Sequence, residues 1–454
     1  MPALNAKRFL TIFIITISAI YIISYLRLPF EDHDTLLYVI IGRALINNHI
    51  LPYGYVFDHK PILLYAIYGI WTKIIPLEKG SLALLSLISI SLFANMAKHF
   101  WNLPFCIVWF SLLLFGAPFL ILSGNTEIVF FPFLFGSIIF LEKPGRAAAI
   151  AGGVSIGLAA EINYISVFSI FLPAIYLAFQ RARKSPLDVF LTALGTSIGF
   201  ITPLLPYLFV EKSVFLHYID MQRLYLGHYG ASPQERLQSI ELFLLLFLCF
   251  APIIFVSLKN CTKSPQRVAL IWTLSGVVAC CVSGHPFRHY FLLVLIPLSL
   301  LIASQWKTLP LRMFWISLAP AILLAGYGTI HDISHNLKLY WRIQAMDFPA
   351  LHQMIGKTPV LNIRASHVPF ALADLQSQTP FLFRHHVQIL YGDNARAWYG
   401  QELARTPRFV MTSPQLCMPP LDMPEICAFI SERYRLLRTE NDEFGFALYE
   451  RKPS

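Results

Sequence analysis

The sequence has few charged residues: Asp, Glu, Lys and Arg make up 13% of its 454 residues. Soluble domains contain about 25% charged and about 45–50% apolar residues. Here 56% of the residues are hydrophobic, and the mean hydropathy is +0.60. A water-soluble chain of this composition would expose large apolar patches. The shortage of charge therefore excludes an ordinary soluble protein and predicts an integral membrane protein.

Cysteine pairs at zinc-finger spacing are also missing. None of the seven cysteines belongs to a CxxC motif, so the sequence indicates no structural zinc site. Cys417 and Cys427 lie in a polar tail, and the segment between them contains Pro419, Pro420 and Pro424. A disulfide and a pair of free thiols both remain open, because the sequence does not fix the separation of the two Cα atoms.

The formal net charge of +10 is concentrated in short loops between long apolar runs. Each run is long enough to cross about 30 Å of hydrocarbon as a helix. With the N-terminus in the cytoplasm, every basic cluster of a short loop falls on the inner side, as the positive-inside rule predicts. This explains the charge without nucleic acid, which we exclude as a partner. The eleven predicted spans cover residues 9–28, 80–97, 103–123, 128–141, 147–160, 164–180, 189–209, 241–258, 267–283, 289–304 and 313–330.

Residues 61–76 form one more apolar run, which this count leaves out. If they crossed the membrane, every later loop would change sides and the basic clusters would lie outside. We therefore predict an interfacial or re-entrant helix on the outer face, with a short true span as the alternative. The predicted fold class is a polytopic α-helical membrane protein of about 11 transmembrane helices, with a first outer loop over residues 29–79.

The last part of the chain, residues 331–454, is more polar than the transmembrane domain, residues 1–330. Its alternation of short apolar runs predicts a small soluble α/β domain on the outer side of the membrane. The predicted strands cover residues 358–363, 408–412, 434–438 and 445–449, and a predicted helix covers 394–404.

The first outer loop carries acids, histidines and a lysine at close spacing. It opens with Glu31-Asp32-His33-Asp34-Thr35 and ends with Phe57-Asp58-His59-Lys60-Pro61. A carboxylate at the rim of a membrane can act as a general base, because partial burial raises its pKa. A lysine there can hold a phosphate as a point charge. Asp34 and Tyr38 are four residues apart and would share a helical face. The alternative is an outer loop that simply faces water.

Four short motifs in this loop form a recognisable signature: Asp34-Thr35-x-x-Tyr38, Arg43-Ala44-Leu45, Leu51-Pro52-Tyr53 and Phe57-Asp58-His59-Lys60-Pro61. They resemble the first loop of the C-type glycosyltransferases, in particular the group that contains protein O-mannosyltransferases, lipid A aminoarabinose transferases and lipopolysaccharide galacturonosyltransferases. The resemblance implies that Asp34 is the catalytic base and that Lys60 contacts the donor phosphate. Thr35 replaces the usual Glu, so the second acid of the motif is unassigned, and Asp32 or Glu31 could substitute for it.

Two later segments extend the resemblance through the membrane part. Gly124-Asn125-Thr126-Glu127 matches the place of a second acidic residue, and Gly284-His285-Pro286-Phe287-Arg288-His289-Tyr290 matches a late basic segment. Simple structural roles stay open: Glu127 at a helix start, Arg288 on lipid headgroups and the histidines as interface residues. A position in water at a helix end stays open for Glu161 in the same way. The resemblance implies catalytic roles for Asp34 and Glu127, phosphate binding by Lys60, Arg288 and His289, and supporting roles for Asp32, Tyr38, His59 and His285.

The resemblance implies an inverting transfer of sugar from a polyprenyl-phosphate donor, a lipid-linked sugar, on the outer face of the cytoplasmic (inner) membrane. The sugar stays open, as does the acceptor, which is lipid A, a polysaccharide or a protein. No cofactor is assigned; a divalent metal is left open, with Asp32, His33, Asp34 and His59 as candidate ligands. The alternatives are a flippase or transporter of lipid-linked sugars and a non-catalytic membrane-anchored binding protein. Polar residues crowded at one mouth, with few charges inside the spans, favour the enzyme.

Overall fold

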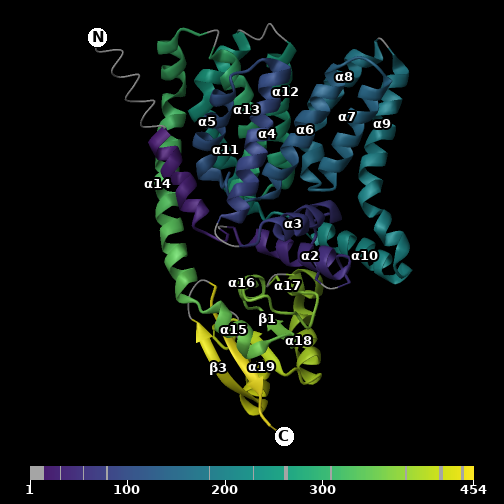
Figure 1. Cartoon of the computed structure of the whole chain (residues 1–454), viewed down its shortest axis with the longest axis vertical. Helices are drawn as coiled ribbons and strands as arrows, with labels where there is room; N and C mark the ends of the chain where they lie inside the picture. The colour runs from purple at the N-terminus through teal and green to yellow at the C-terminus, as the bar shows by residue number, and fades with distance from the viewer. Residues whose placement is uncertain are drawn as a thin grey trace.

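The chain forms a bundle of membrane helices, a layer of short helices across one end of it, and a C-terminal domain beyond that layer (Figure 1). A computed structural model provides the coordinates. It describes residues 15–30, 32–54, 56–77, 80–183, 185–228, 230–259, 264–306, 309–383, 386–418, 423–440 and 444–453.

The bundle consists of apolar helices joined by short connections. A helix over Ile15–Leu26 precedes it. The remaining helices are α4 (Ser81–Trp101), α5 (Phe105–Gly116), α6 (Thr126–Glu142), α7 (Arg146–Ala160), α8 (Ile165–Ala182), α9 (Pro186–Ile201), α11 (Pro233–Lys259), α12 (Ser264–Ser283), α13 (Leu292–Gln305) and α14 (Leu311–Ala345). Three 3₁₀ turns extend or link them: η1 (Ala117–Phe119), η2 (Thr202–Phe209) and η3 (Arg288–Phe291).

Seven helices of the described residues are long and apolar enough to cross a membrane: Ser81–Trp101, Ile165–Ala182, Pro186–Phe209, Pro233–Lys259, Ser264–Ser283, Arg288–Gln305 and Met313–Ile355. Each coincides with a predicted span. The other four predicted spans coincide with shorter helices, namely Ile15–Leu26, α5, α6 and α7; residues 9–14 of the first lie outside the described residues. Large apolar side chains such as Leu248 and Leu323 point outward with 68% and 76% exposure, as a lipid-facing surface requires. The chain is a multi-pass membrane protein.

Helices α2 (Asp34–Asn48) and α3 (Ile62–Ile74) fill most of the predicted first loop, and they pack against each other across the end of the bundle (Figure 1). Glycine permits this close packing, because a Cβ added to Gly69 would lie 2.2 Å from the carbonyl oxygen of Gly42. The 13 residues of α3 extend over about 20 Å, less than the thickness of the hydrocarbon layer. Its position agrees with the expectation of a helix that does not cross.

Helix α10 (Lys212–His228) also lies across this end of the bundle, within the predicted outer loop 210–240 (Figure 1). Helix α14 differs from the prediction. The predicted span ended at residue 330, but the helix continues to Ala345 and reaches the C-terminal domain. Its extension carries polar residues that broke the hydropathy pattern yet pack inside the protein. The Asn336 side chain, for example, is 1% exposed and donates to the hydroxyl of Ser24 (3.3 Å).

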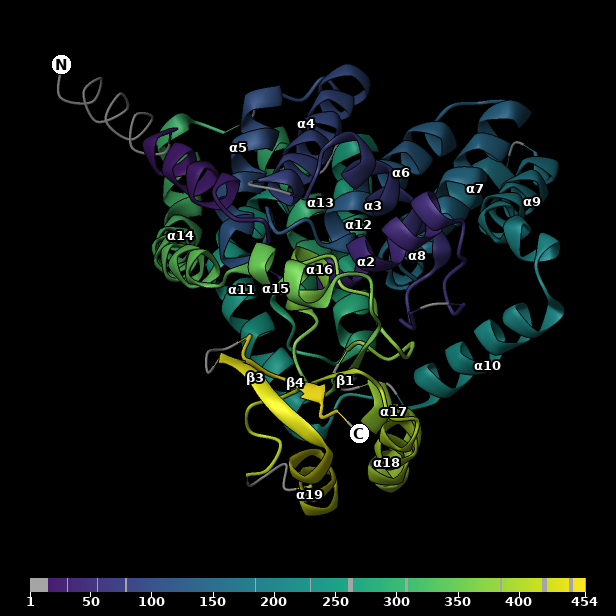
Figure 2. The same ribbon diagram turned by 60° about the horizontal axis from the view of Figure 1, so that its bottom comes forward.

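The C-terminal domain contains one four-stranded sheet of order β1-β2-β4-β3. Strand β1 (Val360–Ile363) is parallel to β2 (Phe409–Thr412), and β4 (Phe446–Arg451) is antiparallel to both β2 and β3 (Tyr434–Glu440). The helices of the domain are α15 (Phe348–Ile355), α16 (Val368–Leu372), α17 (His386–Tyr391), α18 (Ala395–Ala404) and α19 (Pro424–Arg433), with η4 (Gly392–Asn394) between α17 and α18. Figure 2 shows α17, α18 and α19 beside the sheet. All four predicted strands and the predicted helix are confirmed within two residues at each end.

Cys417 and Cys427 are joined by a disulfide, with Cα atoms 6.0 Å apart. Of the two alternatives that the sequence left open, the structure contains the bond.

We predict that Gly69→Val destabilises the protein by about 1–3 kcal/mol, because the side chain would be forced into the backbone of α2. Thermal unfolding of the purified protein in detergent measures this. The matched control is Gly326→Ala on α14, where nothing lies within 4 Å of the added Cβ. Equal melting temperatures for Gly69→Val and the wild type would contradict the close packing of α2 on α3.

Candidate functional site

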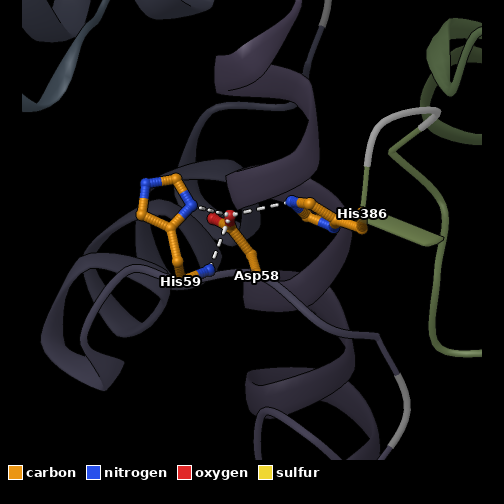
Figure 3. Close-up of side chains that lie close together, drawn as sticks. All are labelled: Asp58, His59 and His386. Carbon is orange, nitrogen blue, oxygen red and sulfur yellow. Dashed lines mark hydrogen bonds and ion pairs between the residues drawn. The ribbon is translucent and has the colours of Figure 1, made fainter. Parts of the chain in front are cut away.

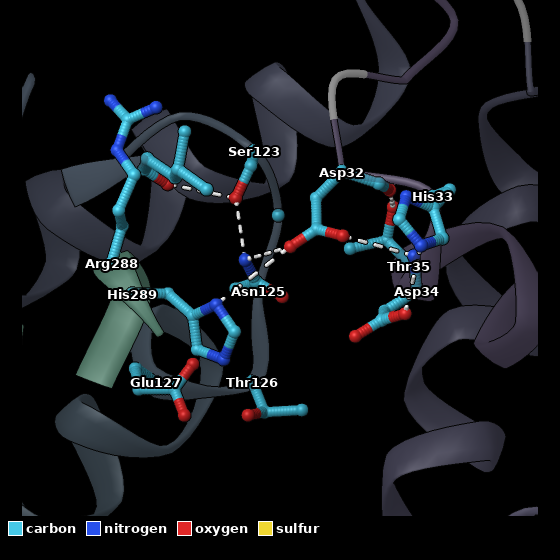
Figure 4. Close-up of polar contacts among 12 residues, drawn as sticks. Asp32, His33, Asp34, Thr35, Ser123, Asn125, Thr126, Glu127, Arg288 and His289 are labelled. Carbon is cyan, nitrogen blue, oxygen red and sulfur yellow. Dashed lines mark hydrogen bonds and ion pairs between the residues drawn. The ribbon is translucent and has the colours of Figure 1, made fainter. Parts of the chain in front are cut away.

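Asp32 is the centre of a polar cluster at the end of the bundle (Figure 4). One of its carboxylate oxygens accepts a hydrogen bond from the Asn125 amide (2.7 Å), and the other accepts one from the backbone N–H of Asp34 (3.0 Å). His289 Nδ1 lies 3.8 Å away. Burial would raise the pKa of Asp32, but His33, His289 and Asn125 outweigh it and hold the pKa below its usual value. Asp32 is therefore ionised at neutral pH and gives the cluster a negative charge.

Asp34 is the first residue of α2 and lies beside this charge. Its side chain is 39% exposed, and His33 Nε2 is 3.6 Å from its carboxylate. Burial and the neighbouring Asp32 carboxylate raise the pKa of Asp34 to about 6, although His33 and His289 act in the opposite direction. A carboxylate with a raised pKa that remains open to solvent is suited to accept a proton near neutral pH.

Asp58 forms a second cluster, just before the start of α3 (Figure 3). Its carboxylate is 3% exposed and accepts hydrogen bonds from the Tyr65 hydroxyl (2.9 Å) and the backbone N–H of His59 (2.8 Å). His59 Nδ1 lies 3.0 Å away, and His386 Nε2 of the C-terminal domain lies 3.8 Å away. Burial opposes ionisation, but His59, His386 and Lys60 hold the pKa of Asp58 well below its usual value.

Lys60 follows this buried carboxylate and is itself only 8% exposed. Its backbone N–H donates to the Tyr65 hydroxyl (3.2 Å), which in turn donates to Asp58. Tyr65 therefore fixes the turn that leads from Asp58 into α3. A lysine side chain can hold a phosphate as a point charge.

Asp58, His59 and His386 could also bind a metal ion. Their ligand atoms lie within 4.8 Å of one another, and no other such group occurs in the described part of the chain. The ligand set left open by the sequence is therefore divided: His59 joins Asp58, whereas Asp32, His33 and Asp34 form no such group. Imidazole and carboxylate ligands suit zinc and similar ions.

Glu127 lies in the first turn of α6 and is fully buried. The Asn163 amide donates to Glu127 Oε1 (3.4 Å) and to the Thr126 hydroxyl (2.8 Å). Glu127 lies beneath His289 in the cluster of Figure 4. Glu161 is fully buried as well, so the alternative in which it lies in water is wrong. It lies in the turn between α7 and α8, inside the packed end of the bundle.

Tyr38 lies one turn after Asp34 but is only 5% exposed, so it belongs to the core. Its ring packs edge-on against Tyr68, with centroids 5.4 Å apart, and Tyr68 donates a hydrogen bond to the carbonyl of Gly124. Tyr38 thus supports α2 from beneath and ties it, through Tyr68, to the start of α6.

The side chains of the late basic segment lie in three different places. Arg288 pairs with Asp332 of α14 (2.7 Å) and donates to the Pro118 carbonyl (2.8 Å), and its side chain stays 41% exposed. His289 joins the Asp32 cluster. His285 lies 3.6 Å from Glu235 at the start of α11 and stacks on Phe287, so it is not brought to Asp34.

Several residues of these clusters were missed by sequence reasoning. Asn125 is an uncharged residue of the Gly124–Glu127 motif, and Tyr65 lies within the apolar run 61–76. His386 and Asp332 gave no signal, because their partners are distant in the sequence.

Comparison with known proteins supports the fold. No family model matches the sequence, and no curated protein matches it significantly. The structure is similar to crystal structures of ArnT from Cupriavidus metallidurans, bound to undecaprenyl phosphate (TM-score 0.67) and in the apo state (TM-score 0.63). Each match has 12% sequence identity and covers 98% of both chains. A weaker similarity, with a TM-score of 0.41, is to an oligosaccharyltransferase from Archaeoglobus fulgidus.

The chain therefore shares the fold of these ArnT structures. The similarity extends over the bundle, the layer of short helices and the C-terminal domain.

We predict that the Asp34 carboxyl group titrates near pH 6 and that Asp32→Asn lowers this pKa, since the neighbouring carboxylate is one cause of the raised value. Carbodiimide labels protonated carboxyl groups, so peptide mass spectrometry of labelled Asp34 against pH measures the pKa. Asp347 at the exposed start of α15 provides an internal reference. An Asp34 pKa that does not change in Asp32→Asn would contradict the proposed influence of Asp32.

Proposed function

We propose that the protein is a glycosyltransferase that moves a sugar from a polyprenyl-phosphate donor to an acceptor. The observation that carries the proposal is that the α2–α3 unit holds both Asp34 and Lys60. Asp34 is a half-exposed carboxylate with a raised pKa and supplies a base. Lys60 is buried and supplies a site for phosphate. The ArnT structure of the same fold holds undecaprenyl phosphate, which supports a lipid-linked donor.

The mechanism is a single displacement. Asp34 accepts the proton of the acceptor hydroxyl, and the acceptor oxygen forms a bond to C1 of the sugar. The bond between C1 and the phosphate oxygen breaks on the opposite face, so the anomeric centre is inverted. The bonding electrons leave with the lipid phosphate, and Lys60 stabilises the charge that develops there.

The other basic residues have supporting roles in this scheme. Arg288 is 41% exposed and could contact the phosphate from the side of η3, while Asp332 orients its guanidinium. His289 and Asn125 keep Asp32 ionised, and this in turn sets the pKa of Asp34. Glu127 is fully buried and accepts a hydrogen bond from Asn163, so we assign it to positioning Asn163 and not to contact with the acceptor.

We place the reaction on the outer face of the cytoplasmic membrane. The basic loops favour that orientation. The disulfide between Cys417 and Cys427 supports it, because disulfides persist in oxidising compartments outside the cytoplasm. The C-terminal domain and α2, which begins at Asp34, lie at the same end of the bundle (Figure 1), so both would face that side.

We predict that Lys60→Ala raises KM for the lipid-phosphate donor about tenfold and lowers kcat, because the charge acts on both the bound and the departing phosphate. Lys60→Arg should recover part of both losses, since it keeps the charge but not the compact shape. Initial rates with a polyprenyl-phosphate sugar and a mixed acceptor pool measure this.

The matched control is Lys73→Ala, at the opposite and exposed end of α3, which should behave like the wild type. Unchanged donor affinity in Lys60→Ala would reject the phosphate role. Movement of lipid-linked sugar across a bilayer without transfer would instead indicate a transporter.

A further inference from the structure

The C-terminal domain contacts the candidate site through buried histidines. His386 begins α17, and its side chain is 2% exposed. Its Nε2 lies 3.8 Å from the Asp58 carboxylate, two residues before Lys60 (Figure 3). The His386 ring also packs edge-on against Phe57, with centroids 4.9 Å apart. One side chain of the tail therefore contacts two consecutive residues of the segment that leads to Lys60.

A second histidine of the domain contacts the other end of the site. His367 is 2% exposed, and its Nε2 is 2.6 Å from the backbone carbonyl oxygen of His33, between Asp32 and Asp34. Burial and the proximity of His33 lower the pKa of His367 to about 4, so the ring is neutral at pH 7. Since a carbonyl only accepts, Nε2 carries the hydrogen and donates it.

An aromatic side chain joins the two histidines. The Phe383 ring lies 5.6 Å from the ring of His367 and 5.0 Å from that of His386, centroid to centroid. It also stacks on His33 at 6.1 Å. A shift of either histidine would therefore be transmitted to the other through direct packing.

Backbone contacts fix the same interface. The N–H of Phe57 donates to the carbonyl of Pro380 (2.6 Å), and the Arg43 guanidinium donates to the carbonyl of Ala371 (3.2 Å). The interface thus follows α2 and the segment before α3, which are the two elements that carry Asp34 and Lys60.

We propose that the C-terminal domain completes the active site, with His367 and His386 as positioning residues that hold Asp34 and Lys60 at a fixed separation. The proposal rests on the glycosyltransferase function proposed above. His386 acts through Asp58 and Tyr65, because Tyr65 bonds both the Asp58 carboxylate and the backbone of Lys60. His367 acts through the peptide that joins His33 to Asp34.

The test uses the full-length protein and compares His386→Gln with His386→Leu. Glutamine keeps an N–H donor at about the reach of Nε2, whereas leucine keeps the volume and removes the donor. We expect His386→Leu to lower kcat/KM for a polyprenyl-phosphate sugar at least tenfold, mostly through KM for the donor, with KM for the acceptor unchanged. His386→Gln should stay within about threefold of the wild type.

The matched control is His352→Leu. His352 belongs to the same domain and bonds the Ala373 carbonyl inside it (2.7 Å). This variant should retain full donor affinity, although it too removes a histidine of the tail. Size-exclusion chromatography and thermal unfolding verify folding. If His386→Leu does not fold, His386→Asn replaces it, because its shorter amide is polar but does not reach Asp58.

A double-mutant cycle with Asp58→Asn tests whether His386 acts through Asp58. If it does, the double variant loses no more kcat/KM than the worse single variant. Additive losses would overturn this route, and wild-type kcat/KM in His386→Leu would overturn the proposal.

Affinity for undecaprenyl phosphate separates this proposal from the proposed function. A wild-type protein that binds undecaprenyl phosphate but transfers no sugar would refute the transferase. In that case the affinity for undecaprenyl phosphate alone tests the histidines. A tenfold loss of this affinity in His386→Leu, without a loss in His352→Leu, supports their positioning role. Equal affinities in the two variants overturn it. A wild-type protein that neither binds undecaprenyl phosphate nor transfers sugar would overturn both proposals.

Discussion

The arrangement of the site depends on one buried charge, the carboxylate of Asp58. An ionised group that is 3% exposed is stable only when its oxygens are hydrogen-bonded and its charge is compensated. Those partners come from three parts of the chain: His59 beside it, Tyr65 on α3 and His386 in the C-terminal domain. The need to stabilise one carboxylate therefore joins the membrane part to the tail next to Lys60.

The second constraint is the close packing of α2 on α3 at Gly42 and Gly69. It sets the position of Asp34, at the start of α2, relative to Lys60, just before α3. Both clusters then act on Asp34, since the charges of Asp32 and Asp58 each help to raise its pKa. The site is thus preorganised by packing and by fixed charges.

Much of the fold could be predicted from the sequence, because hydropathy and strand patterns are local. The seven long helices and the four strands follow directly from such patterns. The length of α14 could not be predicted, because His331, Asp332 and Asn336 end the apolar run while the helix continues. These polar groups are accommodated by partners elsewhere, such as Arg288 and Ser24.

The sequence marks candidate residues of the site in the first loop but not their partners elsewhere in the chain. Asp34 and Lys60 belong to short motifs, and the structure brings their segments together. The contacts of His386 with Asp58 and of His367 with His33 connect residues more than 300 positions apart and leave no local pattern. The burial of Glu161 was missed as well, because a polar residue between two spans normally indicates water.

The most direct test of the central claim is transfer of a labelled sugar from a polyprenyl-phosphate donor by purified wild-type protein and by Asp34→Asn. The account predicts transfer by the wild type and a loss of about a hundredfold or more in the variant, with donor binding retained, because only the base is removed. Transfer by Asp34→Asn at nearly the wild-type rate would contradict it.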